Sequence, residues 1–236
     1  MSAITQRPVL LRMAEVFGPT FQGEGPSVGR LAAFIRLSNC NLACTWCDTP
    51  HTWDWRRFDR AVEQYGAAPG DVLGWAARQP ARLFVITGGE PLVQARRLPE
   101  LVDGLLALGG EVEIETNGTI APPEPLLSDR VVFNVSPKLS GSGMPRTRRI
   151  RPDVLREFAA SGRARFKFVA GTLEELDEIA VLVDESGLAP VWVMPEGTTS
   201  RAVLERMREL ADAVLARGWN LTTRMHVLLW EDERGR

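Results

Sequence analysis

Short runs of β-branched and other apolar residues alternate with amphipathic helical patterns from about residue 30 to residue 223. The predicted strands are Leu31–Leu37, Leu83–Thr87, Val112–Glu115, Val131–Val135, Ala164–Val169, Val191–Val193 and Asn220–Thr223. Strands that alternate with helices form a mainly parallel sheet covered by those helices. The pattern therefore predicts an α/β fold, an open and partial β/α barrel whose functional face lies at the C-terminal ends of the strands.

Three of the intervening helices have clear boundaries in the sequence. They are predicted near 99–108, 172–187 and 200–217, each ending at a glycine. The second begins with Thr172 and Glu175 at capping-box spacing. No internal repeat or low-complexity linker divides the chain, so we expect residues 1–236 to form a single domain.

The charge balance excludes a strong electrostatic footprint for nucleic acid or a membrane surface. The 28 Lys and Arg residues face 30 Asp and Glu residues, for a net charge of −2. No apolar run reaches the length of a membrane span, and Met1–Pro8 lacks the apolar stretch of a signal peptide. We therefore expect a cytoplasmic protein with a small-molecule partner, and interpret the basic stretch Arg146–Arg151 as a solvated loop.

All 3 cysteines of the chain, Cys40, Cys44 and Cys47, lie in one short segment directly after a predicted strand. Clustered cysteines argue against a disulfide framework and favour a metal centre in a reducing compartment. Three thiolates without a fourth can hold an iron–sulfur cluster that leaves one iron open to a ligand. The alternative is a structural zinc site, in which His51 completes a Cys₃His set.

A glycine pair ends the second predicted strand, in the segment Thr87–Pro91. Alone it could be a simple turn between a strand and a helix. Glycines also let the backbone approach a ligand closely.

The cysteine spacing Cys-x₃-Cys-x₂-Cys, followed by Gly-Gly-Glu-Pro, resembles the radical S-adenosylmethionine superfamily. The resemblance implies that the glycine segment binds the methionine end of S-adenosylmethionine, where the Glu90 carboxylate could pair with the ammonium group. Further segments make the chain similar to the 7-carboxy-7-deazaguanine synthase family over about residues 17–226. They are Phe21–Gly25, Arg36, Cys47–Thr49, Glu115–Gly118 and Ser136–Lys138.

This resemblance implies a set of cofactor contacts. Cys40, Cys44 and Cys47 would hold a 4Fe-4S cluster whose fourth iron is chelated by S-adenosylmethionine. The implied S-adenosylmethionine contacts are Gly89, Ser136, Pro137, Lys138, Met194, Pro195, Glu196 and Gly197.

The resemblance also implies the substrate contacts Phe21, Gln22, Gly23, Arg36, Thr87, Glu115 and His226, and makes Thr49 a ligand of Mg²⁺. These residues suit a pterin carboxylate, since Arg36 can form a planar fork with the carboxylate, while Gln22, Glu115 and Thr87 can hydrogen-bond the polar edge of the ring. From the residues alone, Arg36 could instead form a surface ion pair, and His226 could be a satisfied structural histidine.

The implied reaction converts 6-carboxy-5,6,7,8-tetrahydropterin to 7-carboxy-7-deazaguanine with loss of ammonia, a step toward queuosine and other 7-deazapurines. The implied partners are an electron donor such as flavodoxin or ferredoxin and a second copy of the chain in a homodimer. Two alternatives stay open: a glycyl-radical-enzyme activase and a Cys₃His zinc interaction module. Some relatives end soon after the residue matching His226, whereas this chain continues to Arg236, so the tail receives no role here.

Overall fold

In the computed structural model, which describes residues 10–236, nine strands form one sheet in the order β3-β1-β2-β4-β5-β6-β7-β8-β9. Their bounds are β1 Leu11–Phe21, β2 Leu31–Leu37, β3 Tyr65–Ala67, β4 Leu83–Gly88, β5 Glu111–Thr116, β6 Val131–Val135, β7 Ala164–Ala170, β8 Val191–Pro195 and β9 Asn220–Leu221. All neighbours from β2 to β9 are parallel, as predicted, while β1 pairs antiparallel with β2 and β3. The N-terminal stretch Met1–Pro8 lies outside the described residues.

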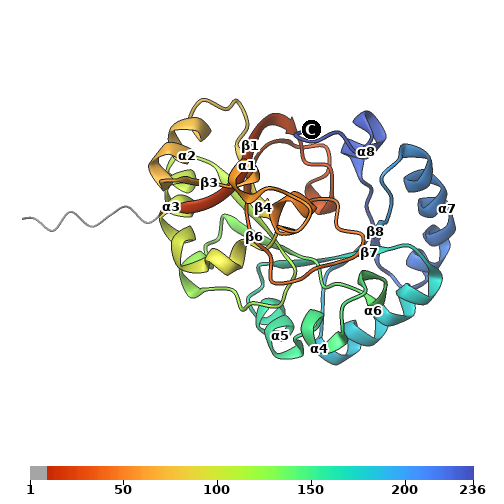
Figure 1. The fold of residues 1–236 in the computed structure, drawn as a ribbon. Helices are drawn as coiled ribbons and strands as arrows, with labels where there is room; N and C mark the ends of the chain where they lie inside the picture. Colours follow the sequence, from red (N-terminus) through yellow and green to blue (C-terminus); the bar gives the residue numbers. More distant parts are fainter. Residues whose placement is uncertain (1–9) are drawn as a thin grey trace, which may run out of the picture.

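Most of the helices lie in an arc around the outside of this curved sheet, and sheet and helices together make the open, partial β/α barrel that the sequence predicts (Figure 1). Their bounds are α1 Arg60–Glu63, α2 Pro69–Ala76, α3 Leu98–Ala107, α4 Arg146–Arg149, α5 Pro152–Ala160, α6 Leu173–Ser186, α7 Ser200–Ala216 and α8 Met225–Trp230. The three predicted helices are confirmed as α3, α6 and α7. Within residues 10–236, none of the helices combines the length and the apolar character that a membrane crossing requires.

Alternation along the strands separates an apolar outer face from a polar inner face. Residues such as Ile35, Ile86 and Phe133 pack in the main core cluster beneath the helices. Since successive side chains of a strand point to opposite sides, their neighbours face the inside of the barrel. The inward-facing residues include Arg36, Thr87, Glu115, Asn134, Lys167 and Met194, all of which line one cavity.

Strands β1 and β3 are absent from the sequence prediction. The apolar pattern of β1 is broken by irregular pairing with β2, with register shifts between Met13 and Glu15 and between Phe17 and Thr20. Irregular pairing of this kind disturbs the period of two on which the prediction depends. Phe21, which lies before the first predicted strand, Leu31–Leu37, is the last residue of β1.

The basic stretch Arg146–Arg151 is not a solvated loop throughout. Residues 146–149 form α4, and the Arg149 side chain is buried, with only 5% of its surface exposed. Its guanidinium donates to Glu178 on α6 at 2.7 Å and to the Lys138 carbonyl at 2.7 Å. Arg149 therefore fastens the loop after β6 to α6.

The end of β4 packs directly against the cysteine loop. Gly88 has φ +141°, and a Cβ atom there would clash with the Leu37 backbone; one on Gly89 would clash with Asn39. Two backbone bonds join the segments, from Gly89 N to Leu37 O at 3.2 Å and from Glu90 N to Asn39 O at 2.9 Å. The glycine pair is therefore needed for packing, whatever contact it makes with a ligand.

We expect Gly88→Ala to lower the free energy of unfolding by at least about 2 kcal/mol, because it adds both backbone strain and a clash with main-chain atoms. Gly74→Ala is the matched control, since a Cβ there has no atom within 4 Å and the residue lies inside α2. It should raise stability by up to about 1 kcal/mol. Urea denaturation of the two variants measures both effects, and equal changes would contradict the packing argument.

Candidate active site

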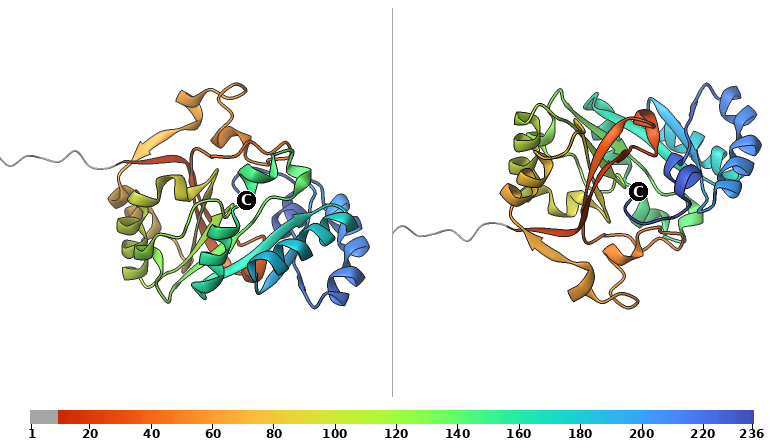
Figure 2. Two further views of the ribbon diagram at one scale, coloured as in Figure 1. Left: turned by 90° about the horizontal axis from the view of Figure 1, so that it is seen from below. Right: turned by 90° about the horizontal axis from the view of Figure 1, so that it is seen from above.

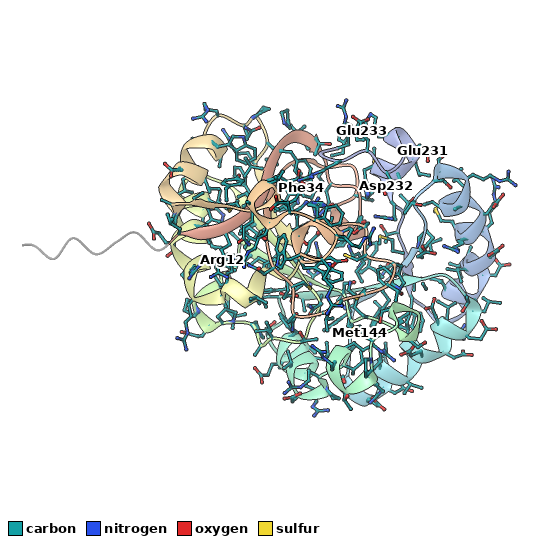
Figure 3. All side chains as sticks on the ribbon, viewed as in Figure 1. Arg12, Phe34, Met144, Glu231, Asp232 and Glu233 are labelled. Carbon is teal, nitrogen blue, oxygen red and sulfur yellow. The ribbon has the colours of Figure 1, made fainter. Side chains whose placement is uncertain are left out.

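A cavity of about 290 Å³ occupies the inside of the barrel at the C-terminal ends of the strands. It brings together every predicted site residue except Pro137, Pro195 and Gly197, which do not line it. Side chains from many elements converge here, and Figure 3 labels three of the lining residues, Phe34, Asp232 and Glu233. The cysteines and the predicted substrate contacts thus share one cavity.

The three cysteines are free, partly buried thiols on the loop after β2. Backbone N–H of Leu42 donates to Cys40 Sγ at 3.4 Å, and the Trp53 indole N–H donates to Cys47 Sγ at 3.3 Å. Burial raises the pKa of Cys40 to about 12. It also raises the pKa of Cys44, against the opposing effect of the Lys138 ammonium. Three clustered thiols, two of which accept N–H bonds at sulfur, fit an iron–sulfur cluster, since such bonds stabilise coordinated thiolates.

Polar contacts fix the cysteine loop to the end of β5. Asn41 Nδ2 donates to Thr119 Oγ1 at 2.7 Å, and Asn117 Nδ2 donates to Asn41 Oδ1 at 2.9 Å. Asn39, at φ +77°, turns the chain into the loop and donates its N–H to Thr52 O at 2.7 Å. The sulfur atoms are therefore carried by a loop with defined partners on both sides.

Glu90 supports the backbone rather than a ligand. Its carboxylate is fully buried and accepts bonds from Leu92 N at 3.0 Å, Thr116 Oγ1 at 2.8 Å and Asn117 N at 2.6 Å. Burial raises the pKa of Glu90, and the three hydrogen-bond donors oppose this effect by stabilising the charged carboxylate. The expectation that Glu90 pairs with an ammonium group is therefore wrong: the carboxylate joins the ends of β4 and β5.

Gln22, Thr87 and Glu115 form one hydrogen-bond network on the inner face. Thr87 Oγ1 donates to Glu115 Oε2 at 2.7 Å, and Gln22 Nε2 donates to Glu115 Oε1 at 3.3 Å. Gln22 Nε2 also donates to Glu113 Oε2 at 3.1 Å, as does Asn134 Nδ2 at 3.0 Å. Glu113 and Asn134 are not among the site residues predicted from the sequence, although their inward register on β5 and β6 is a signal that could have found them.

Arg36 lies inside the cavity and not on the surface. Its side chain is 16% exposed, its Nε donates to Glu15 Oε1 at 2.8 Å, and its guanidinium lies 5.4 Å from the Phe17 ring centroid. Within residues 10–236 its two terminal nitrogens make no further hydrogen bond. Arg36 therefore forms an ion pair with Glu15 and also points into the cavity. The terminal nitrogens of its guanidinium are available for a substrate carboxylate.

His226 on α8 packs against Gly23, where any Cβ atom would clash with the imidazole. Met225 N donates to Gly23 O at 2.8 Å, so α8 is held against this turn. Burial lowers the pKa of His226, against the Glu24 carboxylate 3.9 Å away, so the ring is neutral at neutral pH. Phe21, at the same turn, stacks on Trp230 of α8 with ring centroids 6.3 Å apart.

A buried charge cluster stands beside this turn. The Glu24 carboxylate forms ion pairs with Lys167 of β7 and with Arg224, whose Nε lies 3.2 Å from Glu24 Oε1. Although burial opposes it, the two cations hold the pKa of Glu24 far below its usual range. Neither cation was singled out from sequence. The inward register of Lys167 on a parallel strand is a signal that could have found it.

The predicted cofactor loops show different environments. Lys138 Nζ donates to Ser136 Oγ at 3.0 Å and lies 5.6 Å from the Trp46 ring, next to Cys44. On the other side, Met194 is buried at the end of β8, and Glu196 forms an ion pair with Arg206. Gly197 contributes its carbonyl, which accepts a 2.6 Å bond from Arg224 Nη1.

The zinc alternative finds no support in this geometry. His51 is buried with its ring edge toward Phe58 and its Nε2 3.9 Å from Glu15. Among residues 10–236, no group of three or more His, Cys, Asp or Glu side chains is placed to hold a single metal ion.

Thr49 lies at the cavity, with its hydroxyl oxygen 3.8 Å from Cys47 Sγ.

The C-terminal segment Asp232–Arg236 also lines the cavity. Arg234 donates to Glu15 Oε2 at 3.0 Å and to Glu63 Oε2 at 2.9 Å. Glu15 thus accepts from Arg36 and Arg234 together. Figure 2 shows this end of the chain beside β1, over the open side of the barrel.

An open barrel with three clustered thiols at its mouth and a glycine pair against them is the arrangement of radical S-adenosylmethionine enzymes. The model of the Radical SAM superfamily matches residues 34–128. SuiB from Streptococcus suis, solved bound to S-adenosylmethionine, shares the fold with a TM-score of 0.55 at 17% identity, over 78% of this chain and 48% of that one.

The chain belongs to the 7-carboxy-7-deazaguanine synthase family. The synthase of Pyrobaculum aerophilum is 36% identical over 96% of this chain and 97% of its own, and that of Escherichia coli K12 is 32% identical over 89% and 94%. The crystal structure of QueE from Escherichia coli superimposes with a TM-score of 0.70 at 28% identity, covering 92% of this chain and 95% of that one. The chain is therefore a radical S-adenosylmethionine enzyme, which uses a 4Fe-4S cluster and S-adenosylmethionine.

We expect Glu24→Gln to cost about 3 kcal/mol of unfolding free energy, because it leaves Lys167 buried without its ion-pair partner and removes one of the two carboxylates paired with Arg224. Glu205→Gln, in the exposed Arg201–Glu205 pair, is the control and should cost less than about 0.5 kcal/mol. Since the folded-state pKa of Glu24 is lowered, its contribution is present above its unfolded pKa of about 4.3 and is lost as the pH falls. Urea denaturation should therefore show the gap between wild type and Glu24→Gln narrowing below about pH 4. A constant gap, or equal costs for the two variants, would contradict the charge-cluster argument.

Proposed function

We propose that this enzyme converts 6-carboxy-5,6,7,8-tetrahydropterin to 7-carboxy-7-deazaguanine with loss of ammonia, in 7-deazapurine and queuosine biosynthesis. The observation that carries the proposal is a single cavity in which the cysteine loop faces an arginine fork and a connected network of amide, hydroxyl and carboxylate groups. These groups are complementary to a bicyclic, amide-rich ring with one carboxylate. The family membership of the chain supports the same reaction.

The residues of the chain would bind and orient the substrate. The terminal edge of Arg36 would pair with the pterin carboxylate, while Gln22, Thr87 and Glu115 would hydrogen-bond the polar edge of the ring. Phe21 and Gly23 would form the wall of the pocket, and His226, neutral because burial lowers its pKa, would donate or accept one hydrogen bond. Pre-formed contacts among these groups reduce the ordering needed on binding.

On the opposite wall, Cys40, Cys44 and Cys47 would hold the 4Fe-4S cluster. Gly89, Ser136, Lys138 and Met194 would contact S-adenosylmethionine from the inside of the cavity, whereas Pro137, Pro195 and Gly197 would act through the shape of their loops. When bound, the cluster and S-adenosylmethionine supply the radical that removes a hydrogen atom from the pterin C6.

Thr49 would provide an oxygen ligand for Mg²⁺ at the substrate carboxylate. Its hydroxyl lies at the cavity with only the 3.8 Å contact to Cys47 Sγ among the described residues, so the oxygen fits a hard cation. Bound there, Mg²⁺ would neutralise the carboxylate and orient it.

The remaining parts of the proposal have two sources. A flavodoxin or ferredoxin as electron donor and a homodimer rest on the family resemblance, whereas a cytoplasmic location and one domain over residues 1–236 rest on the composition and patterning of the sequence. A glycyl-radical-enzyme activase, the enzyme alternative, acts on another protein. The polar network around Glu115 favours a small substrate instead.

The reconstituted protein, assayed anaerobically with reductant, S-adenosylmethionine and 6-carboxytetrahydropterin, should form 7-carboxy-7-deazaguanine by mass spectrometry. S-adenosylmethionine should not be consumed in proportion to product. Cys40→Ala, Cys44→Ala and Cys47→Ala should each abolish product and cluster absorbance, whereas His51→Ala should retain the cluster. Radical transfer to a partner protein without pterin conversion would support the activase, and a colourless zinc protein would support the interaction module.

Arg36→Ala should lower kcat/KM for the carboxylated substrate by at least about 30-fold, because removing one partner of a buried charge pair costs about 2–5 kcal/mol. Cluster absorbance should stay at the wild-type level. Arg30→Ala is the control, since Arg30 forms an exposed pair with Glu111 and does not line the cavity. If Arg36→Ala and Arg30→Ala have equal kinetics, Arg36 does not bind the carboxylate.

A further inference from the structure

Arg224 contacts three separate segments of the active site with one guanidinium group. Its Nε donates to Glu24 at 3.2 Å, its Nη1 donates to the Gly197 carbonyl at 2.6 Å, and its Nη2 forms an ion pair with Asp48. The side chain is 7% exposed. A buried arginine that uses all three nitrogens is held in one orientation.

Each of the three partners belongs to a segment with a different proposed task. Glu24 follows Gln22 and Gly23 in the turn proposed to contact the substrate. Asp48 lies between Cys47 and Thr49, the proposed ligands of the cluster and of Mg²⁺. Gly197 ends the loop proposed to contact S-adenosylmethionine.

We propose that Arg224 is a positioning residue that sets the Asp48–Thr49 loop relative to the turn Gln22–Glu24, so that Mg²⁺ and the pterin carboxylate meet in the correct geometry. The inference rests on the proposed function. It assigns Arg224 no contact with the substrate, the cluster or the reacting atoms.

The charge of Arg224 alone does not explain this arrangement. Lys167 already forms an ion pair with Glu24, so the carboxylate keeps a buried counter-charge without Arg224. What Arg224 adds is a planar fork that reaches Asp48 and Glu24 together. A lysine at this position keeps the charge but offers a single nitrogen, and therefore separates positioning from charge neutralisation.

Of the three contacts of Arg224, the ion pair with Asp48 can be removed with the least disturbance to the fold. The Asp48 side chain is 41% exposed, so Asp48→Asn removes the charge without leaving a buried vacancy. If Arg224 acts through Asp48, the variants Arg224→Lys and Asp48→Asn remove the same link. Their combination should then be no worse than the stronger single variant.

The test measures equilibrium binding of 6-carboxypterin to the cluster-loaded protein, over a range of Mg²⁺ concentrations, for wild type, Arg224→Lys, Asp48→Asn and the double variant. Mg²⁺ should increase the affinity for the pterin in wild type. We expect the Mg²⁺ concentration that gives half of this increase to be at least about 10-fold higher in each variant. Affinity without Mg²⁺ should change less than about twofold, and the two substitutions should not be additive. In Asp48→Asn, which leaves the bond from Arg224 to Gly197 in place, the absorbance of the cluster and the cleavage of S-adenosylmethionine without pterin should stay at wild-type levels. Arg217→Lys, in a pair with Asp177 outside the cavity, is the control and should change neither affinity nor Mg²⁺ response.

An unchanged Mg²⁺ response in both single variants overturns the inference, as do additive effects. If wild type forms 7-carboxy-7-deazaguanine in the turnover assay, such a result leaves the proposed function intact. If wild type neither binds nor converts the pterin, the proposed function falls and the inference falls with it. If Arg224→Lys does not retain the cluster, the test rests on Asp48→Asn. A shifted Mg²⁺ response in this variant supports the inference, and an unshifted response overturns it.

Discussion

The close contact between the end of β4 and the cysteine loop is the constraint on which the site depends. Gly88 and Gly89 let two backbone segments touch where a side chain would force them apart, and Glu90 then accepts two hydrogen bonds from the end of β5. Two neighbouring strand ends and the cysteine loop therefore form one rigid unit. A cluster held by the loop would be fixed relative to the cavity floor, as redox chemistry on a bound substrate requires.

The inner face of the barrel needs a different kind of stabilisation. Polar and charged side chains such as Glu113, Glu115 and Lys167 are withdrawn from water there, and each would be costly alone. The structure satisfies them by mutual contact, through Gln22 and Asn134 for the carboxylates. A network of this kind fixes the orientation of the groups before a ligand arrives, so part of the ordering cost of binding is already met in folding.

The sequence predicted the parallel core and the composition of the site, because both depend on local signals. Regular alternation marks β2 and β4 to β8, and short motifs mark the cysteine loop and the glycine pair. It did not predict β1, whose irregular pairing hides the period of two, or the buried position of Arg149 in a stretch of arginines. The role of Glu90 was also misjudged, because a carboxylate beside a ligand motif looks the same whether it faces the ligand or the backbone. Lys167 and Arg224 depend on partners more than 140 residues away along the chain, and no local pattern reports such partners.

Those distant pairs also explain how an incomplete barrel encloses a cavity. A complete barrel closes by pairing its first and last strands, whereas here β3 and β9 are separate edges of one sheet. The gap is spanned by the turn after β1, which bonds to the last segments of the chain through Thr222 Oγ1 to Gly25 O at 3.1 Å and Met225 N to Gly23 O at 2.8 Å. The Glu24–Arg224 and Glu15–Arg234 pairs join the same two ends of the chain. Because ion pairs and single hydrogen bonds are easier to rearrange than a strand ladder, this side of the barrel is held less rigidly than the side closed by paired strands.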